Sequence, residues 1–156
     1  MHLSVICTGN ICRSPIGEVV YADALADLPD FRVTSAGTAV WHVGQAMDPR
    51  ARAALDRAGF TRQGSLGAYA DRTYLDSVDV VIAMTRDHRR DVLAVRPDAE
   101  VVLVREMVGD GELDVADPYF GSDADFDDVL RVIRLSVPGL RRHLARRGNA
   151  ASRPEA

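Results

Sequence analysis

Short apolar runs alternate along the chain with longer segments in which apolar residues recur every three or four positions. Residues 3–6 and 101–104 are runs typical of strands, and residues 78–84 form a nearly unbroken one, as expected for a strand buried on both faces. Residues 31–34 alternate between apolar and polar. This pattern predicts a half-covered or edge strand, which Ser35-Ala36-Gly37-Thr38 then interrupts.

Helical segments separate these strands. Residues 15–28 place an apolar side chain every four positions, and Ser14-Pro15 supplies the N-cap and first position that begin a helix. A second helix is predicted from Asp48-Pro49 to Gly59, with the same start signal and a glycine stop. Residues 86–95 also favour a helix.

The last predicted helix carries an apolar face from Phe126 to Leu144. Pro138 is expected to kink or break it near Ser136, because proline lacks the N–H and crowds the preceding turn. Strands that alternate with helices predict an α/β fold, here a single-domain, four-stranded parallel sheet with helices on both faces. Residues 1–147 would form this domain and residues 148–156 a flexible tail.

Composition limits the classes of function. The 156 residues carry a net charge of −4, which argues against nucleic acid as a partner. No apolar run approaches the roughly 18 residues needed to span a bilayer, so no membrane association is expected. The chain begins with a strand, so no signal peptide is expected, and its two cysteines indicate a reducing compartment. Together these features predict a cytoplasmic protein.

All basic residues are arginine. The absence of lysine excludes a Walker-type phosphate loop and Schiff-base chemistry. The histidines at positions 2, 42, 88 and 143 are scattered without metal-ligand spacing and are expected to be solvated or partly packed. Only His42 lies near a candidate pocket residue. Neither a metal site nor a cofactor is predicted.

Residues 7–14, Cys-Thr-Gly-Asn-Ile-Cys-Arg-Ser, carry the most specific chemistry. They place a thiol at the end of the first strand, then Gly9 and Asn10, which tolerate positive φ, and then Arg13 at a helix start. A loop around a helix N-terminus gathers backbone N–H groups and binds anions. The positive electrostatic potential that binds an anion there also favours the thiolate form of a cysteine. The pattern therefore predicts attack by Cys7 on a phosphate monoester, with Arg13 binding the phosphate oxygens.

Such a reaction needs a general acid and base. Asp117 is the best candidate, because it follows the fourth strand and Pro118 restricts its conformation, although Asp-Pro is also a common turn. Trp41, Tyr119 and Phe120 flank the two candidate loops. Their rings either form a slot for a flat aromatic leaving group or pack on the core.

These motifs resemble those of the low-molecular-weight protein tyrosine phosphatases. The matching segments are Cys7–Pro15, Ser35–Thr38 followed by Trp41, Asp48-Pro49-Arg50 and Asp117-Pro118-Tyr119, and Trp41-His42-Val43-Gly44 is similar to actinobacterial members. The resemblance implies hydrolysis of phosphotyrosine in protein substrates. We expect a monomer, with weak self-association through exposed rings at the pocket mouth.

The resemblance also implies roles for individual residues. Cys7 would be the nucleophile, Arg13 the phosphate-binding residue and Asp117 the acid and base. Cys12 would form a reversible disulfide with the nucleophile and protect it from overoxidation. The other implied positions are the phosphate-loop residues Thr8, Gly9, Asn10, Ile11 and Ser14, of which Asn10 and Ser14 organise the loop, and the pocket walls Trp41, Tyr119 and Phe120.

Two positions bear on specificity within the family. Ile11 matches the tyrosine-specific members, whereas a threonine there would suggest a protein-arginine phosphatase. The run Met84-Thr85-Arg86-Asp87-His88 departs from the Met-Asp of many members. We expect this departure to affect the pocket floor or the support of the loop.

Other interpretations use the same loop. An arsenate reductase of this fold would need a third, resolving thiol, and the chain has two cysteines. A phosphocarrier that keeps its phosphocysteine would need neither Arg13 nor Asp117. A phosphopeptide-binding module or a thiol redox switch would use the loop without hydrolysis.

Overall fold

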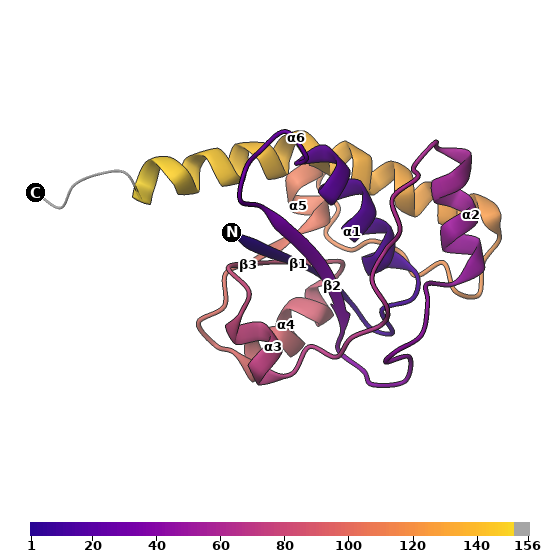
Figure 1. The fold of residues 1–156 in the computed structure, drawn as a ribbon, viewed down its shortest axis with the longest axis horizontal. Coiled ribbons are helices and arrows are strands. Elements are labelled where there is room, and N and C mark those ends of the chain that lie inside the picture. The colour runs from indigo at the N-terminus through magenta and orange to yellow at the C-terminus, as the bar shows by residue number, and fades with distance from the viewer. Residues whose placement is uncertain (152–156) are drawn as a thin grey trace, which may run out of the picture.

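Four parallel strands form a single sheet in the order β2-β1-β3-β4 (Figure 1). The computed structural model describes residues 1–151. The strands are β1 (His2–Cys7), β2 (Arg32–Gly37), β3 (Val80–Ala83) and β4 (Val101–Leu103). The helices of this part of the chain are α1 (Arg13–Ala24), α2 (Pro49–Arg57), α3 (Arg72–Asp76), α4 (Arg86–Val95), α5 (Val104–Val108) and α6 (Asp123–Ala151). The segment that alternates between apolar and polar, β2, lies at an edge of the sheet as predicted.

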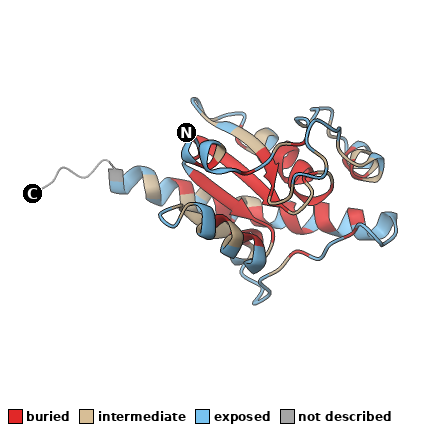
Figure 2. Cartoon of the chain, turned by 90° about the horizontal axis from the view of Figure 1, so that it is seen from below, coloured by how far each residue is buried: buried red, intermediate tan, exposed pale blue. Residues whose placement is uncertain are grey.

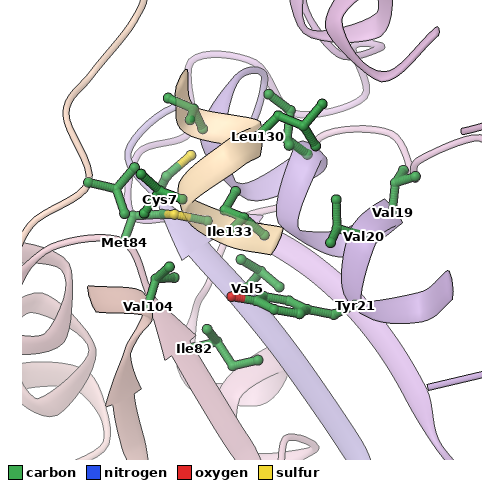
Figure 3. Packing of buried hydrophobic residues seen from close by; sticks show 14 of the residues in the cluster. Val5, Cys7, Val19, Val20, Tyr21, Ile82, Met84, Val104, Leu130 and Ile133 are labelled. Carbon is green, nitrogen blue, oxygen red and sulfur yellow. The ribbon is translucent and has the colours of Figure 1, made fainter. Parts of the chain in front are cut away.

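Helices cover both faces of the sheet (Figures 1 and 2). Because side chains alternate along a strand, Val5 and Cys7 of β1 join the large core cluster with α1, α2, α5 and α6, part of which Figure 3 shows. Ile6 points the other way and joins a smaller cluster with Leu75 of α3 and Val92 of α4. The predicted single-domain α/β fold with a four-stranded parallel sheet is confirmed.

The carboxyl ends of β1 and β2 lie side by side, with Cys7 paired to Gly37. A Cβ atom on Gly37 would lie 2.5 Å from the carbonyl oxygen of Thr8, so this close approach requires glycine. The predicted interruption of β2 at Ser35 is wrong, because β2 runs on to Gly37. Ser35 is accommodated since its buried hydroxyl donates to the Glu18 carboxylate at 2.5 Å.

The first helix begins and ends earlier than predicted. Residue Cys12, rather than Ser14, is the N-cap of α1, and the helix ends at Ala24 instead of residue 28. Ser14 lies inside the first turn, where its hydroxyl bonds to other side chains of the loop. The start of α2 is as predicted, since Asp48 accepts a hydrogen bond from the Arg50 N–H.

Of the kink or break predicted near Ser136, the break is wrong, because the C-terminal helix α6 is continuous through Pro138; a kink there stays a prediction. Buried side chains on both sides of the proline, including Ile133 and Leu140, hold the helix against the sheet and α1. Residues 148–151 belong to α6, and 152–156 of the predicted tail lie outside the described residues. The flexibility of that tail stays a prediction.

Helix α4 covers the predicted residues 86–95, whereas the short helices α3 and α5 were not predicted. Both have only five residues, which is too short for an apolar period to be recognised in the sequence.

Candidate active site

Asn10 holds the loop between β1 and α1 in shape. Its backbone has φ of 57°, in the left-handed region that asparagine tolerates. The side-chain amide of this buried residue donates to Ser14 Oγ at 2.8 Å and to Ser35 Oγ at 2.9 Å. Its Oδ1 accepts from the Ala68 N–H at 2.9 Å. One side chain therefore joins the loop to α1, to β2 and to the segment before α3.

The thiol of Cys7 lies at the bottom of this loop. Its Sγ is 2.9 Å from Ser14 Oγ, and the residue is 2% exposed. Because Ser14 Oγ already accepts a hydrogen bond from Asn10, its own hydroxyl proton is available to the sulfur. A hydroxyl donor at this distance stabilises a sulfur that carries negative charge.

Arg13 connects the loop to the segment that contains Asp117. Its buried guanidinium donates from Nη1 to the Val115 carbonyl at 3.0 Å, and its Nη2 lies 3.5 Å from Asp117 Oδ2. The Asp117 side chain is 57% exposed, so it can exchange protons with water. The structure thus brings Asp117 to Cys7 and Arg13, although it lies more than 100 positions after them in the sequence.

A pocket of about 310 Å³ opens over the thiol. It is lined by Cys7, Thr8, Gly9, Ile11, Cys12, Arg13, Trp41, His42, Asp117, Tyr119 and Phe120. Asn10 and Ser14 support the loop from beneath instead of lining the pocket. Phe120 is 96% exposed and meets Tyr119 edge to face at 4.9 Å between ring centroids. The rings therefore stand at the mouth and are not packed into the core.

Two contacts fix the start of the loop that carries Asp117, which we call the acid loop (residues 114–121). The Val115 N–H donates to the Met84 carbonyl at 2.9 Å, just beyond β3. Arg86 donates from its backbone N–H and from its guanidinium to the Asp114 carboxylate. The same guanidinium lowers the pKa of Asp114. These hydrogen bonds hold the start of the acid loop, Asp114 and Val115, at the carboxyl end of the sheet.

His88 is a buried member of the site that the sequence did not reveal. Its Nε2 lies 2.8 Å from Thr8 Oγ1 and its Nδ1 3.0 Å from Thr85 Oγ1. Burial, together with the charge of Arg13, lowers the pKa of His88 to about 4. The expectation of solvated or partly packed histidines is wrong here and for His2, because both are buried. The sequence signal that could have placed His88 near the site was Thr85, an N-cap residue two positions after the buried strand β3.

Residues 84–88, where the sequence differs from the Met-Asp of many family members, thus support the loop between β1 and α1. Thr85 caps α4 by accepting from the His88 N–H, which turns the imidazole towards Thr8. The expected effect on the support of the loop therefore has a structural basis.

Cys12 differs from Cys7 in its surroundings. Burial, with the nearby carboxylate of Asp48, raises the pKa of Cys12 to about 12. Cys12 is therefore a neutral thiol at physiological pH. Neither cysteine is part of a disulfide in the structure.

Two further observations concern ligands and membranes. Within residues 1–151, no group of three or more histidine, cysteine or acidic side chains is arranged to hold a metal ion. None of the helices in this described part is both long and apolar enough to cross a membrane.

Protonation of His88 should make stability depend on pH. The native state keeps the imidazole neutral down to about pH 4, whereas the unfolded chain binds the proton near pH 6.5. Since the unfolded state binds more protons in this window, the free energy of unfolding should fall as pH drops from about 6.5 to 4, by on the order of 3 kcal/mol. Urea unfolding at several pH values would measure this loss.

The contribution of His88 can be separated from other groups by substitution. His88→Asn and His88→Gln should both flatten the pH dependence by a similar amount, even if their stabilities at pH 7.5 differ. Direct NMR titration of the wild-type imidazole with a midpoint near 6.5 would contradict the prediction.

Comparison with known proteins agrees with this geometry. Residues 2–150 match the family model for low molecular weight phosphotyrosine protein phosphatases. The low molecular weight protein-tyrosine phosphatase A of Mycobacterium tuberculosis is 39% identical over 90% of this chain and 89% of that protein. A low molecular weight protein-tyrosine-phosphatase of Streptomyces coelicolor is 33% identical over 86% of this chain and 88% of its own.

Solved structures show the same fold. The protein tyrosine phosphatase of Entamoeba histolytica superposes with a TM-score of 0.87, at 25% identity over 94% of this chain and 97% of that chain. YfkJ from Bacillus subtilis gives a TM-score of 0.85, at 25% identity over 94% of this chain and 96% of that chain.

The chain therefore belongs to the low molecular weight phosphotyrosine protein phosphatase family and is an enzyme of that class. The predicted resemblance, including that to actinobacterial members, is confirmed.

Proposed function

We propose that this enzyme hydrolyses phosphotyrosine in proteins, and small aryl phosphates, through a phosphocysteine intermediate. In the first step the Cys7 thiolate attacks phosphorus, the S–P bond forms, and the bond from phosphorus to the aryl oxygen breaks. Asp117 gives its proton to the departing oxygen. In the second step Asp117 takes a proton from water as the water attacks phosphorus, which releases phosphate and restores the thiolate.

The observation that carries this proposal is the convergence of three groups on one pocket. The Cys7 sulfur, the Arg13 guanidinium and the Asp117 carboxylate all line it. A guanidinium can bind two phosphate oxygens at once in a fork. It thereby stabilises the negative charge that is spread over these oxygens in the transition state. The Ser14 hydroxyl, 2.9 Å from the sulfur, would stabilise the thiolate both as nucleophile and as leaving group.

The rings at the mouth favour an aromatic substrate. Trp41, Tyr119 and Phe120 line the pocket around the thiol, and stacked aromatic contacts suit the flat ring of phosphotyrosine. The other interpretations fit these residues less well. A phosphocarrier would gain nothing from an acid beside Arg13, and the chain lacks the third thiol of an arsenate reductase.

The test is a covalent trap. Rapid acid quench during turnover of a phosphotyrosine peptide should give a protein heavier by one phosphoryl group, located at Cys7 by peptide mapping. A phosphoserine peptide of the same sequence should react far more slowly. Turnover with no phosphorylated Cys7 at any quench time, or equal rates on the two peptides, would overturn the proposal.

Replacing the proposed acid should have an effect that depends on the leaving group. Asp117→Asn is expected to lower kcat/KM for phenyl phosphate by about 10²-fold and for p-nitrophenyl phosphate much less, because general acids contribute most where the departing oxygen is most basic. The measurement is kcat/KM across a series of substituted phenyl phosphates. Equal slowing across the series would mean that another group is the acid.

Further properties of the enzyme stay predictions. We propose that Cys12, a neutral thiol near the nucleophile in sequence, forms a reversible disulfide with Cys7 under oxidation and so prevents overoxidation. Phosphotyrosine proteins would be the partners of a monomeric, cytoplasmic enzyme without a cofactor.

A further inference from the structure

The N-terminus of α2 forms a link between the phosphate loop and the acid loop. The Asp48 N–H donates to the Ile11 carbonyl of the phosphate loop at 2.8 Å. The Asp48 carboxylate holds the Arg50 guanidinium in a fork, with 3.0 Å to Nε and 2.9 Å to Nη2. The third guanidinium nitrogen, Nη1, donates to the Tyr119 carbonyl of the acid loop at 2.9 Å.

Ring contacts strengthen this link. The Arg50 guanidinium carbon lies 4.7 Å from the centroid of the fully buried Phe126 ring and 5.4 Å from that of Tyr119. These distances lie within the range of cation–π attraction. Arg50 is therefore held by a carboxylate and a buried ring, and it contacts the acid loop through both the carbonyl and the ring of Tyr119.

Asp117 lies between two fixed points of that loop. On its N-terminal side, Arg13 holds the Val115 carbonyl, and on its C-terminal side Arg50 holds the Tyr119 carbonyl. Between them the exposed Asp117 carboxylate accepts only the Tyr119 N–H at 3.1 Å among backbone groups of the described chain. The carboxylate also lies 3.5 Å from Arg13 Nη2, so release of the Tyr119 anchor would free the C-terminal side of the segment that orients it.

From these contacts we infer that Arg50 is a positioning residue, which holds Asp117 over the thiol through the Tyr119 carbonyl. The inference rests on the proposed function, because it assigns Asp117 the role of acid and base. Arg50 does not line the pocket, so it acts through the acid loop and not through contact with substrate. If the acid is misplaced, kcat/KM should fall for those substrates whose reaction is limited by protonation of the leaving group.

The experiment compares Arg50→Met with a matched control on the same helix. Arg52 has the same types of contact, a carboxylate (Asp56) and backbone carbonyls, but its carbonyl partners are Phe60 and Arg62. We expect Arg50→Met to lower kcat/KM for phenyl phosphate by about tenfold and for p-nitrophenyl phosphate by less than about threefold. Arg52→Met should leave both values within about twofold, and Arg50→Lys, which keeps the charge but not the fork, should be intermediate.

A double-mutant cycle tests whether Arg50 acts through Asp117. In an Asp117→Asn background, Arg50→Met should cause no further loss. Additive losses, or equal losses for both substrates, would overturn the role of Arg50 while leaving the proposed function intact. If Asp117→Asn itself shows no dependence on the leaving group, the role of Asp117 fails and the inference falls with it.

Hydrogen–deuterium exchange provides a readout independent of activity. Residues 114–121 should exchange faster in Arg50→Met than in wild type or Arg52→Met, while β1 and β3 stay protected. Unchanged exchange in this segment would contradict the positioning role. Increased exchange throughout the protein would instead indicate general destabilisation and would also contradict it.

Discussion

Cys7→Ser is expected to lower turnover of p-nitrophenyl phosphate by at least about 10⁴-fold, as is typical when an enzyme loses its nucleophile. A serine hydroxyl at this position is neutral near pH 6 and is a far weaker nucleophile than a thiolate. The other groups proposed to bind phosphate remain, so the variant should still bind vanadate or inorganic phosphate. Steady-state assays under reducing conditions, with calorimetric titration of phosphate, measure both effects.

Cys12→Ser is the matched control for this substitution. It removes a thiol from the same loop, but that thiol has a pKa of about 12 and is neutral during turnover. We expect Cys12→Ser to retain turnover within about tenfold of wild type, since buried polar substitutions cost stability more than chemistry. Retained turnover in Cys7→Ser, or equal loss in both variants, would show that Cys7 is not the nucleophile.

Local patterns in the sequence predicted most of the sheet and much of the pocket. Asp48-Pro49 marks the start of α2 because an N-cap acceptor and a proline act within one turn. The buried run at residues 78–84 identified β3, because both faces of an inner strand are covered. Cys7 could be placed at the carboxyl end of β1, where ligands bind in parallel sheets.

The errors arise where distant residues determine the local structure. Residues 35–38 are predicted to interrupt the strand, yet Glu18 and Asn10 satisfy the buried Ser35 hydroxyl from other elements and β2 continues to Gly37. Pro138 would break an isolated helix, yet burial of α6 on both sides of it maintains the helix. His88 reaches Thr8 across 80 positions of sequence. No local pattern contains these contacts, because they depend on how the elements pack.

Arg13→Lys should cause the second-largest loss, about 10²- to 10³-fold in kcat/KM, comparable to the removal of an oxyanion donor. Lysine keeps the charge but replaces a planar fork by a single ammonium group, so it can neither grip two phosphate oxygens nor reach the Val115 carbonyl at the same time. Inhibition by vanadate, which resembles the five-coordinate transition state, should weaken more than KM rises.

Arg86→Lys is the control for this prediction, because Arg86 also grips the acid loop, through Asp114, but at the surface and outside the pocket. Exposed ion pairs contribute about 1 kcal/mol or less, so Arg86→Lys should stay within about threefold of wild type. A loss in Arg13→Lys no larger than in this control would mean that charge alone binds the phosphate. A large loss confined to Arg13→Lys would mean that the geometry of the guanidinium stabilises the transition state.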